Sequence, residues 1–312
     1  MGIKDKLAWH EAWFASYTEG FLERAKNGQG GQGGQGGQDG QDGQGGQGPT
    51  GDIGPFLLKI EHTAKVLANA KTIVASQDFM DQLGAIEDGV HRADIIHACH
   101  LAALYHDVGR FPQYRDYGTF ADALSVNHAI VSARTLAREG ILQGEHHAVR
   151  RLVIGAVALH NRYILPNTIT DTLRIVTDVV RDADKLDIVR IMAPQLSFAS
   201  LEEAKKQANK DGHNVVTMHV KDEPELWSEA VVKDALAGRV AKYTDMRYIN
   251  DFRIVMGTWI QEFRFPASLE RLAMSGLMHD IFAGLPQNDV MSELTAYLLE
   301  PLTPFVGEKT LR

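Results

Sequence analysis

Residues 101–109 read LAALYHDVG, an apolar run that ends in a histidine, an aspartate and a glycine. The apolar spacing extends back towards Ala93 and predicts a buried helix over 93–108. Gly109 is predicted to cap this helix, because glycine commonly follows the last helical turn. His106 and Asp107 are therefore expected where a buried helix meets a loop. Neighbouring side chains point about 100° apart on a helix, so the pair can share one metal ion, or Asp107 can bridge two, if other helices supply further ligands.

Helical spacing of apolar residues recurs along most of the chain. It predicts helices over residues 8–25, 55–76, 125–139, 146–160, 170–191 and 225–243, with more towards residue 312. The aromatic stripe of 8–25 needs a partner surface, and the aromatic-rich residues 252–260 are predicted to be core. The best strand signal, at 215–220, fits a short edge strand or an extended loop. The predicted fold class is all-α.

A tract rich in glycine and glutamine interrupts this pattern at residues 28–52. Glutamine recurs at every third position from Gln29 to Gln47, which is the period of collagen, but the tract lacks the proline that pre-organises a triple helix. We interpret it as a flexible loop insertion between two packed helices. Trimming Gly28–Gly48 is therefore expected to spare metal binding.

The chain is predicted to form a single domain, because no separate linker precedes its C-terminal third. The expected parts are an N-terminal helix (1–27), the loop insertion (28–52), a metal-binding helical core (53–200) and a helical extension (201–312).

Composition excludes several classes of protein. The 40 acidic and 32 basic residues give a net charge of −8, and no run of Lys or Arg occurs, so we expect no nucleic-acid partner. The single cysteine, Cys99, provides neither a disulfide framework nor a thiolate metal cluster. No apolar stretch approaches the roughly 18 residues of a membrane span, and the N-terminus lacks the apolar region of a secretion signal. We therefore expect a cytoplasmic protein without a membrane partner.

Further histidines and an aspartate accompany the His106-Asp107 pair on separate predicted helices: His62, His128, His160 and Asp184. The order His…His-Asp…His…His…Asp resembles the HD superfamily of metal-dependent phosphohydrolases, between His62 and Asp187. The longer strings HDVGRF (106–111), YGTF (117–120), HNRY (160–163) and RDADKLD (181–187) resemble a bacterial branch of that superfamily with two metals. The expected architecture is an HD-type helical bundle with a C-terminal helical extension.

The resemblance implies a ligand set. His62, His106, Asp107 and Asp184 would hold a first metal, and Asp107 would bridge to a second held by His128 and His160. Imidazoles and carboxylates without thiolates suit Fe, Mn, Co, Ni or Zn better than a dedicated Mg²⁺ or Ca²⁺ cage. An acceptor behind each imidazole is expected to orient it.

Two positions in that set have competing interpretations. Asp182 and Asp187 lie near Asp184, and the family pattern of Asp followed by Lys favours Asp184, with Asp187 as a structural partner. His128 follows an asparagine near a helix start and could instead be a surface residue of the cap.

The other histidines are assigned ordinary roles. His97 and His100 are expected to be satisfied core or surface residues, because they lie on other sides of the helix from His106. His146-His147 fits helix capping and solvation. The remaining histidines have no motif around them and are expected at the surface: His10, His91, His213, His219 and His279.

The chemistry that the resemblance implies is hydrolysis of a phosphate ester or anhydride of a nucleotide or other small phosphorylated metabolite, by a metal-activated hydroxide. Asp107 and Lys185 are the predicted catalytic residues. The predicted phosphate-binding cations are Arg110, Arg115, Arg162 and Lys185.

Two alternative functions remain at this point: a di-iron oxygenase of the inositol-oxygenase type and a non-catalytic nucleotide-sensing module. The oxygenase uses a similar ligand set, so the ligands alone do not separate it from the hydrolase. Oxygen consumption with iron would indicate the oxygenase, and phosphate release with Mn²⁺ or Co²⁺ would indicate the hydrolase. The complete ligand set argues against the sensor, because a sensor without activity can lose ligands.

Overall fold

The computed structural model describes residues 2–27, 52–198 and 220–306. Within these ranges every regular element is a helix, apart from an isolated bridge between Lys221 and Tyr248, so the prediction of an all-α fold is confirmed. Residues 28–51 of the predicted loop insertion and 215–219 of the possible strand lie outside the described residues. None of the helices in the described part is long and apolar enough to cross a membrane.

The structure divides into two compact units, residues 1–183 and 184–312. Helix α8 (Asp171–Leu196) is continuous and contributes residues to both. The sequence predicts a single domain. That stays a prediction, because the structure has two compact units but the unbroken helix α8 belongs to both.

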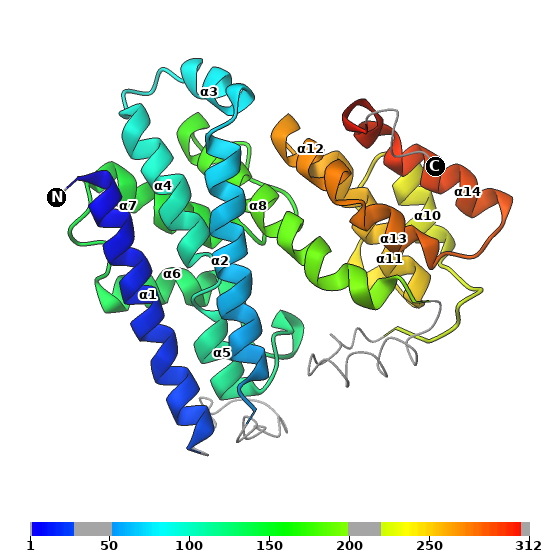
Figure 1. Ribbon diagram of the computed structural model, residues 1–312, viewed down its shortest axis with the longest axis horizontal. Coiled ribbons are helices and arrows are strands. Elements are labelled where there is room, and N and C mark those ends of the chain that lie inside the picture. Colours follow the sequence, from blue (N-terminus) through cyan, green and yellow to red (C-terminus); the bar gives the residue numbers. More distant parts are fainter. Residues whose placement is uncertain (1, 28–51, 199–219, 307–312) are drawn as a thin grey trace. The chain divides into compact units, whose positions relative to one another are not determined.

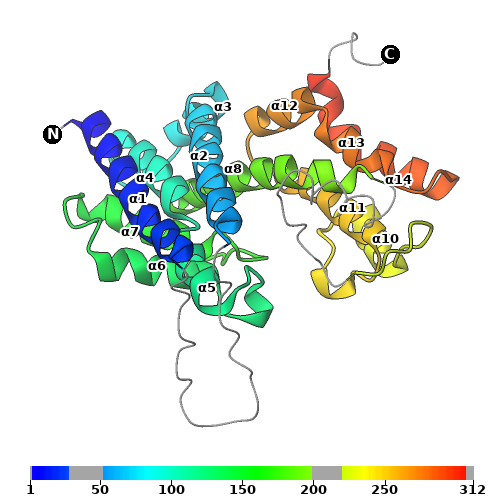
Figure 2. The ribbon, with the colours of Figure 1, turned by 60° about the horizontal axis from the view of Figure 1, so that its bottom comes forward.

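The first unit is a bundle around α4 (Figures 1 and 2). Its α-helices before α8 are α1 (Ile3–Lys26), α2 (Gly54–Val74), α3 (Gln77–Gly84), α4 (Arg92–Tyr105), α5 (Arg110–Tyr117), α6 (His128–Glu139) and α7 (His147–Leu159). Helix α4 contacts α1, α2 and α7, and α6 packs against both α5 and α7. Burial of α4 on several sides explains its nearly continuous apolar sequence.

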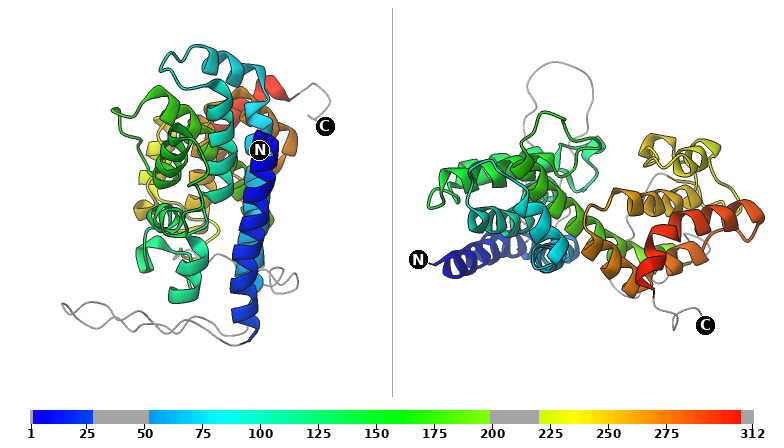
Figure 3. Two further views of the ribbon diagram at one scale, coloured as in Figure 1. Left: turned by 90° about the vertical axis from the view of Figure 1, so that its left-hand side faces the viewer. Right: turned by 90° about the horizontal axis from the view of Figure 1, so that it is seen from above.

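The aromatic stripe of α1 finds its partner within this unit. Phe14 and Phe21 are buried, and their rings lie 5.9 Å and 5.7 Å from the ring of Phe111 at the start of α5. Phe56 of α2 stacks on the same ring, with its centroid 6.1 Å from that of Phe111, and also lies 5.9 Å from the ring of Phe21. The aromatic cluster therefore attaches α1, which runs along the outside of the unit (Figure 3, left), to the segment that follows His106-Asp107.

Three predicted helix details are wrong. Gly109 has a right-handed backbone (φ −71°) and is the N-cap of α5, so it does not close α4 as a left-handed C-cap. Residues 106–109 form the turn that joins α4 to α5, and glycine is needed at 109 for close packing against α6. The helix predicted over 125–139 begins at His128, after the N-cap Asn127. The helix predicted over 225–243 is reduced to α10 (Glu229–Leu236).

The second unit contains the rest of the helical extension. Its further helices are α10, α11 (Ile249–Thr258), α12 (Pro266–Ser275), α13 (Leu277–Ala283) and α14 (Asp289–Leu299). Helix α11 contacts α10, α13 and α14, and all its residues are buried, which agrees with the core predicted at 252–260. The charge of Arg253 in this core is satisfied by carbonyl oxygens of Leu196 and Phe198 and by the Asn250 side chain.

Candidate metal centre

The first unit brings five of the predicted ligands together from separate elements. His62 lies in the middle of α2, His106 and Asp107 directly follow α4, His128 begins α6 and His160 directly follows α7. All five side chains are buried. The structure thus brings these five side chains together, while their role as metal ligands stays a prediction.

The carboxylate of Asp107 lies between two pairs of imidazoles. Its Oδ2 is 3.6 Å from Nε2 of His62 and 3.8 Å from Nε2 of His106. Its Oδ1 is 3.4 Å from Nε2 of His128 and 3.9 Å from Nε2 of His160. Within each pair the two Nε2 atoms are close, at 3.2 Å for His62 and His106 and 3.1 Å for His128 and His160. Each carboxylate oxygen therefore faces its own pair of nitrogens.

The partners of the opposite ring nitrogens determine which atoms carry protons. Nδ1 of His106 lies 2.8 Å from the carbonyl oxygen of Ala103, and Nδ1 of His160 lies 2.8 Å from that of Val157. A carbonyl only accepts hydrogen bonds, so both Nδ1 atoms donate, and in the neutral rings Nε2 presents a lone pair. Several lone pairs thus converge with Asp107 in a buried space, an arrangement that a cation satisfies and that suits transition metals.

Asp122 is a functional candidate that sequence reasoning missed. Its Oδ2 lies 2.7 Å from Nδ1 of His128, and it also accepts from the side chains of Gln113 and Asn161. Burial raises the pKa of Asp122, but its hydrogen bond with His128 and the nearby charges outweigh this and lower the pKa to about 2. Asp122 lies in a short 3-10 turn, where no periodicity marks a residue as inward-facing. It is the acceptor expected behind His128.

Asp122→Asn is expected to weaken metal binding about 10- to 100-fold, the usual effect of changing a group that orients a ligand. The amide keeps the shape of the side chain but loses the negative charge that makes the His128 imidazole a better ligand. Titration calorimetry with Mn²⁺ or Co²⁺ measures the change. Asp116→Asn removes the same charge from α5, where Asp116 pairs with Arg115, and should leave affinity unchanged. Equal affinities in the two variants would contradict a role for Asp122.

Two cations approach Asp107. Nζ of Lys59 is 2.8 Å from Oδ2, and Nε of Arg110 is 3.4 Å from Oδ1. Burial raises the pKa of Asp107, but Lys59, His106 and Arg110 together hold it well below its usual range. Asp107 is therefore an ionised, buried acceptor. Lys59 was also missed by sequence reasoning, although its position three residues before His62 on the same helix face is a signal that could have found it.

The other predicted phosphate-binding residues have separate surroundings. Arg115 pairs with Asp116, and its guanidinium lies 5.6 Å from the centre of the Phe21 ring. Arg162 is exposed, and its carbonyl oxygen accepts from Arg181. Lys185 belongs to the second unit, where its Nζ is 2.8 Å from Oε2 of Glu262. Within the contacts described, Arg110 is the predicted phosphate contact that approaches Asp107.

Asp184 is the first residue of the second unit and lies on α8, immediately after Ala183. The carbonyl oxygen of Ala183 accepts a hydrogen bond of 3.0 Å from Asn69, which lies about two helical turns beyond His62 on α2. Asp184 is half-buried, and its role as a ligand stays a prediction. Asp187 is buried and pairs with Arg190 at 2.6 Å, which fits its interpretation as a structural partner.

Two histidines differ from their predicted surroundings. His10 was expected at the surface, but it is only 1% exposed, because the helix that carries it packs this side against α4. His97 was expected to be satisfied, but neither ring nitrogen makes a hydrogen bond of acceptable geometry with the described residues, although Nε2 lies 3.3 Å from Oε2 of Glu145. His91 and His279 are exposed as expected, and His213 and His219 lie outside the described residues.

Comparison with known proteins supports the resemblance seen in the motif. The family model for the HD domain matches residues 60–188, a range that includes all six predicted ligands. Comparison with curated proteins and with solved structures finds no match. HD domains bind divalent metals and are in general phosphohydrolases. On this match, and on the helices that bring its histidines around Asp107, residues 60–188 form an HD domain.

Proposed function

We propose that the chain is a metal-dependent phosphohydrolase that cleaves a phosphate ester or anhydride of a nucleotide or other small phosphorylated metabolite. The observation that carries the proposal is the Asp107 carboxylate, whose two oxygens face two separate pairs of imidazole nitrogens. A carboxylate in this position is suited to bridging two cations, and the HD-domain match over residues 60–188 supports the reaction class.

In this proposal His62, His106, Asp107 and Asp184 hold one divalent cation, and Asp107, His128 and His160 hold the other. The three residues of the second group offer ligand atoms within 4.8 Å of one another. When bound, such a pair of ions supplies a water of lowered pKa as nucleophile and binds phosphoryl oxygens. Nitrogen-rich ligands without thiolates favour Fe, Mn, Co, Ni or Zn.

The residues of the chain contribute positive charge beside the ligands. Lys59 and Arg110 both lie against the ring of Phe120, at 5.4 Å and 5.8 Å from its centre, so the ring helps to fix their positions. Nη1 of Arg110 is held by Gln113 and Asp122, while its buried Nε has no hydrogen-bond partner among the described residues. In the proposed reaction Arg110, with Lys185, neutralises the negative charge that develops on the phosphoryl group. Arg115 and Arg162 then serve as outer contacts for the substrate.

A metal-reconstitution screen tests the proposal. Chain freed of metal by a chelator is loaded separately with Mn²⁺, Co²⁺ or Fe²⁺ and given nucleoside mono-, di- and triphosphates and simple sugar phosphates. We expect phosphate or pyrophosphate release that depends on the added metal. Oxygen uptake by the iron-loaded chain, without phosphate release from any substrate, would replace the proposal by the oxygenase. Nucleotide binding without either reaction would replace it by the sensor.

A further inference from the structure

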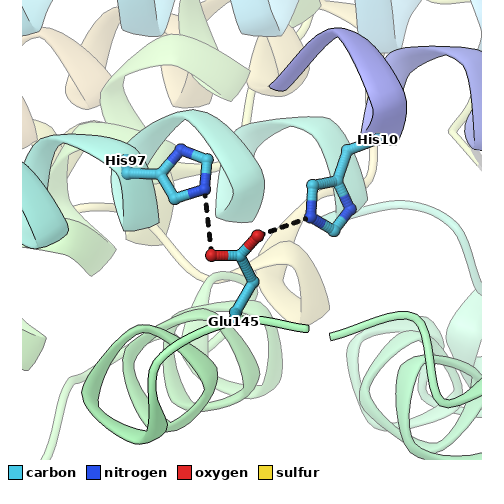
Figure 4. A group of neighbouring side chains, drawn as sticks. All are labelled: His10, His97 and Glu145. Atoms are coloured by element: carbon cyan, nitrogen blue, oxygen red, sulfur yellow. Dashed lines mark hydrogen bonds and ion pairs between the residues drawn. The ribbon is translucent and has the colours of Figure 1, made fainter. Parts of the chain in front are cut away.

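A second group of buried polar side chains lies in the first unit and contains none of the predicted HD-motif ligands. His10 comes from α1, His97 from α4 and Glu145 from the turn that precedes α7 (Figure 4). Nε2 of His10 is 3.2 Å from Oε1 of Glu145, and Nε2 of His97 is 3.3 Å from Oε2. The three side chains are 1%, 2% and 8% exposed. We call these three residues the α1 cluster; it shares no residue with the candidate metal centre.

His97 is the unexplained member of the α1 cluster. It is aimed at Glu145, as Figure 4 shows, yet neither of its nitrogens makes a hydrogen bond of acceptable geometry with the described residues. A buried imidazole without a hydrogen-bond partner is unfavourable, and native structures avoid it. A cation between His97 and Glu145 removes the penalty at Nε2, the nitrogen that faces the carboxylate, because the Nε2 lone pair binds the ion directly.

The contacts of His10 are compatible with the same arrangement. Its Nδ1 lies 2.7 Å from the hydroxyl oxygen of Tyr105, which in turn lies 3.4 Å from the carbonyl oxygen of His10. When the Tyr105 hydroxyl donates to that carbonyl, its oxygen accepts from Nδ1, and Nε2 presents its lone pair to Glu145. Tyr105 then orients His10 as acceptors behind metal-bound imidazoles do.

The charge state of the α1 cluster also suits a cation. Burial lowers the pKa of both His10 and His97, although Glu145 acts in the opposite direction, so both rings are neutral near neutral pH. Burial raises the pKa of Glu145, but Lys6 and His10 outweigh it and the pKa is lowered. Two neutral imidazoles and an ionised carboxylate are the forms in which these side chains bind metals.

We propose that His10, His97 and Glu145 bind one divalent transition-metal ion of the Zn²⁺ class. Two histidines and a glutamate are an established zinc ligand set, and a tetrahedral ion with ligands at about 2.0–2.1 Å places neighbouring ligand atoms roughly 3.3 Å apart. The two observed nitrogen–oxygen distances match this spacing. A water molecule completes the coordination. The ion joins α1 to α4 and to the turn before α7, and so adds to the aromatic contacts that hold α1.

Lys6 provides a distinctive control, because it competes for the same carboxylate. Its Nζ lies 3.0 Å from Oε2 of Glu145, and it is a partly exposed residue of α1. Lys6 and the metal are alternative partners for Glu145. Removing the lysine charge with Lys6→Gln is therefore expected to tighten Zn²⁺ binding several-fold, whereas a cluster with only a structural role predicts no such gain.

The experiment measures Zn²⁺ bound per chain after dialysis against a weak chelator, in a full-length Asp107→Ala background that disables the candidate metal centre. This background is expected to retain one ion per chain. Adding Glu145→Gln should abolish binding, while His100→Gln, a change of the same kind one turn from His97 on α4, should leave one ion bound. Co²⁺ in place of Zn²⁺ should give the strong visible absorption of four-coordinate cobalt, and Glu145→Gln should remove it.

Absence of Zn²⁺ from the Asp107→Ala chain overturns the proposal, as does equal Zn²⁺ content in the Glu145→Gln and His100→Gln variants. Circular dichroism checks that each variant is folded. If Glu145→Gln does not fold, Lys6→Gln decides the matter, because it removes no ligand: tighter Zn²⁺ binding supports the site, and unchanged or weaker binding overturns it.

Discussion

Asp107→Ala is expected to lose metal from the candidate centre and to lower phosphate release by about a thousandfold or more, because Lewis-acid catalysis contributes several kcal/mol to the barrier. The two oxygens of Asp107 lie within 3.4–3.9 Å of four imidazole nitrogens, and alanine leaves both pairs without the shared carboxylate. Lys59 and Arg110 also lose their common counter-charge, so positive charge collects where cations should bind.

Metal analysis and the phosphate-release assay on the same sample measure this result. Asp81→Ala is the matched control: Asp81 is exposed on α3, where its carboxylate accepts from Gln77, and its loss should alter neither quantity. Circular dichroism distinguishes a folded, inactive chain from an unfolded one. A folded Asp107→Ala chain with wild-type activity would refute both the bridging role and the proposed function.

Gly109→Ala is expected to destabilise the chain by about 1–3 kcal/mol or more and to weaken metal binding, because it overpacks a close contact between helices. A Cβ at Gly109 would lie 2.4 Å from the backbone nitrogen of Ser132 and 2.6 Å from the carbonyl oxygen of His128. Both are main-chain atoms of α6, so the helix itself must move. His128 is the first residue of that helix, and any shift carries its imidazole away from Asp107 and His160.

Denaturant unfolding and metal titration together test this prediction. Gly20→Ala is the matched control, since Gly20 lies inside α1 with nothing within 4 Å of the position of a Cβ. Alanine there should be neutral or stabilise the helix by about 0.5–1 kcal/mol, the opposite sign. A Gly109→Ala chain with unchanged stability and metal affinity would show that α6 tolerates the displacement.

Much of the fold could be predicted because helical periodicity is a local property. The bounds of α1, α2, α4, α7 and α8 lie within five residues of those predicted, since each helix presents apolar side chains at helical spacing. The ends were less accurate. Gly109 was assigned to the end of α4 on its residue type, but the backbone there is set by contact with α6, which the neighbouring sequence does not reveal.

The residues of the candidate site also fall into those that the sequence motif reveals and those that only the folded structure reveals. His62, His106, Asp107, His128 and His160 could be chosen from the motif, because a binding motif restricts residue type and order. Asp122 could not, because it acts from a turn and its importance lies in the ring it contacts. His10 was misassigned for a related reason. A single histidine on an amphipathic helix carries no sign of what packs against it, and here Tyr105 and Glu145 do.

By itself the sequence determined the class of fold, the order of the helices and the residue types available to bind metal, because these depend on local spacing and on side-chain chemistry. Tertiary structure decided which side chains meet. It placed Asp107 between two pairs of imidazoles, brought Asp122 behind His128 and buried His10 with His97 and Glu145. Such meetings join residues far apart in the chain, and their distances follow from how whole helices pack rather than from any local pattern.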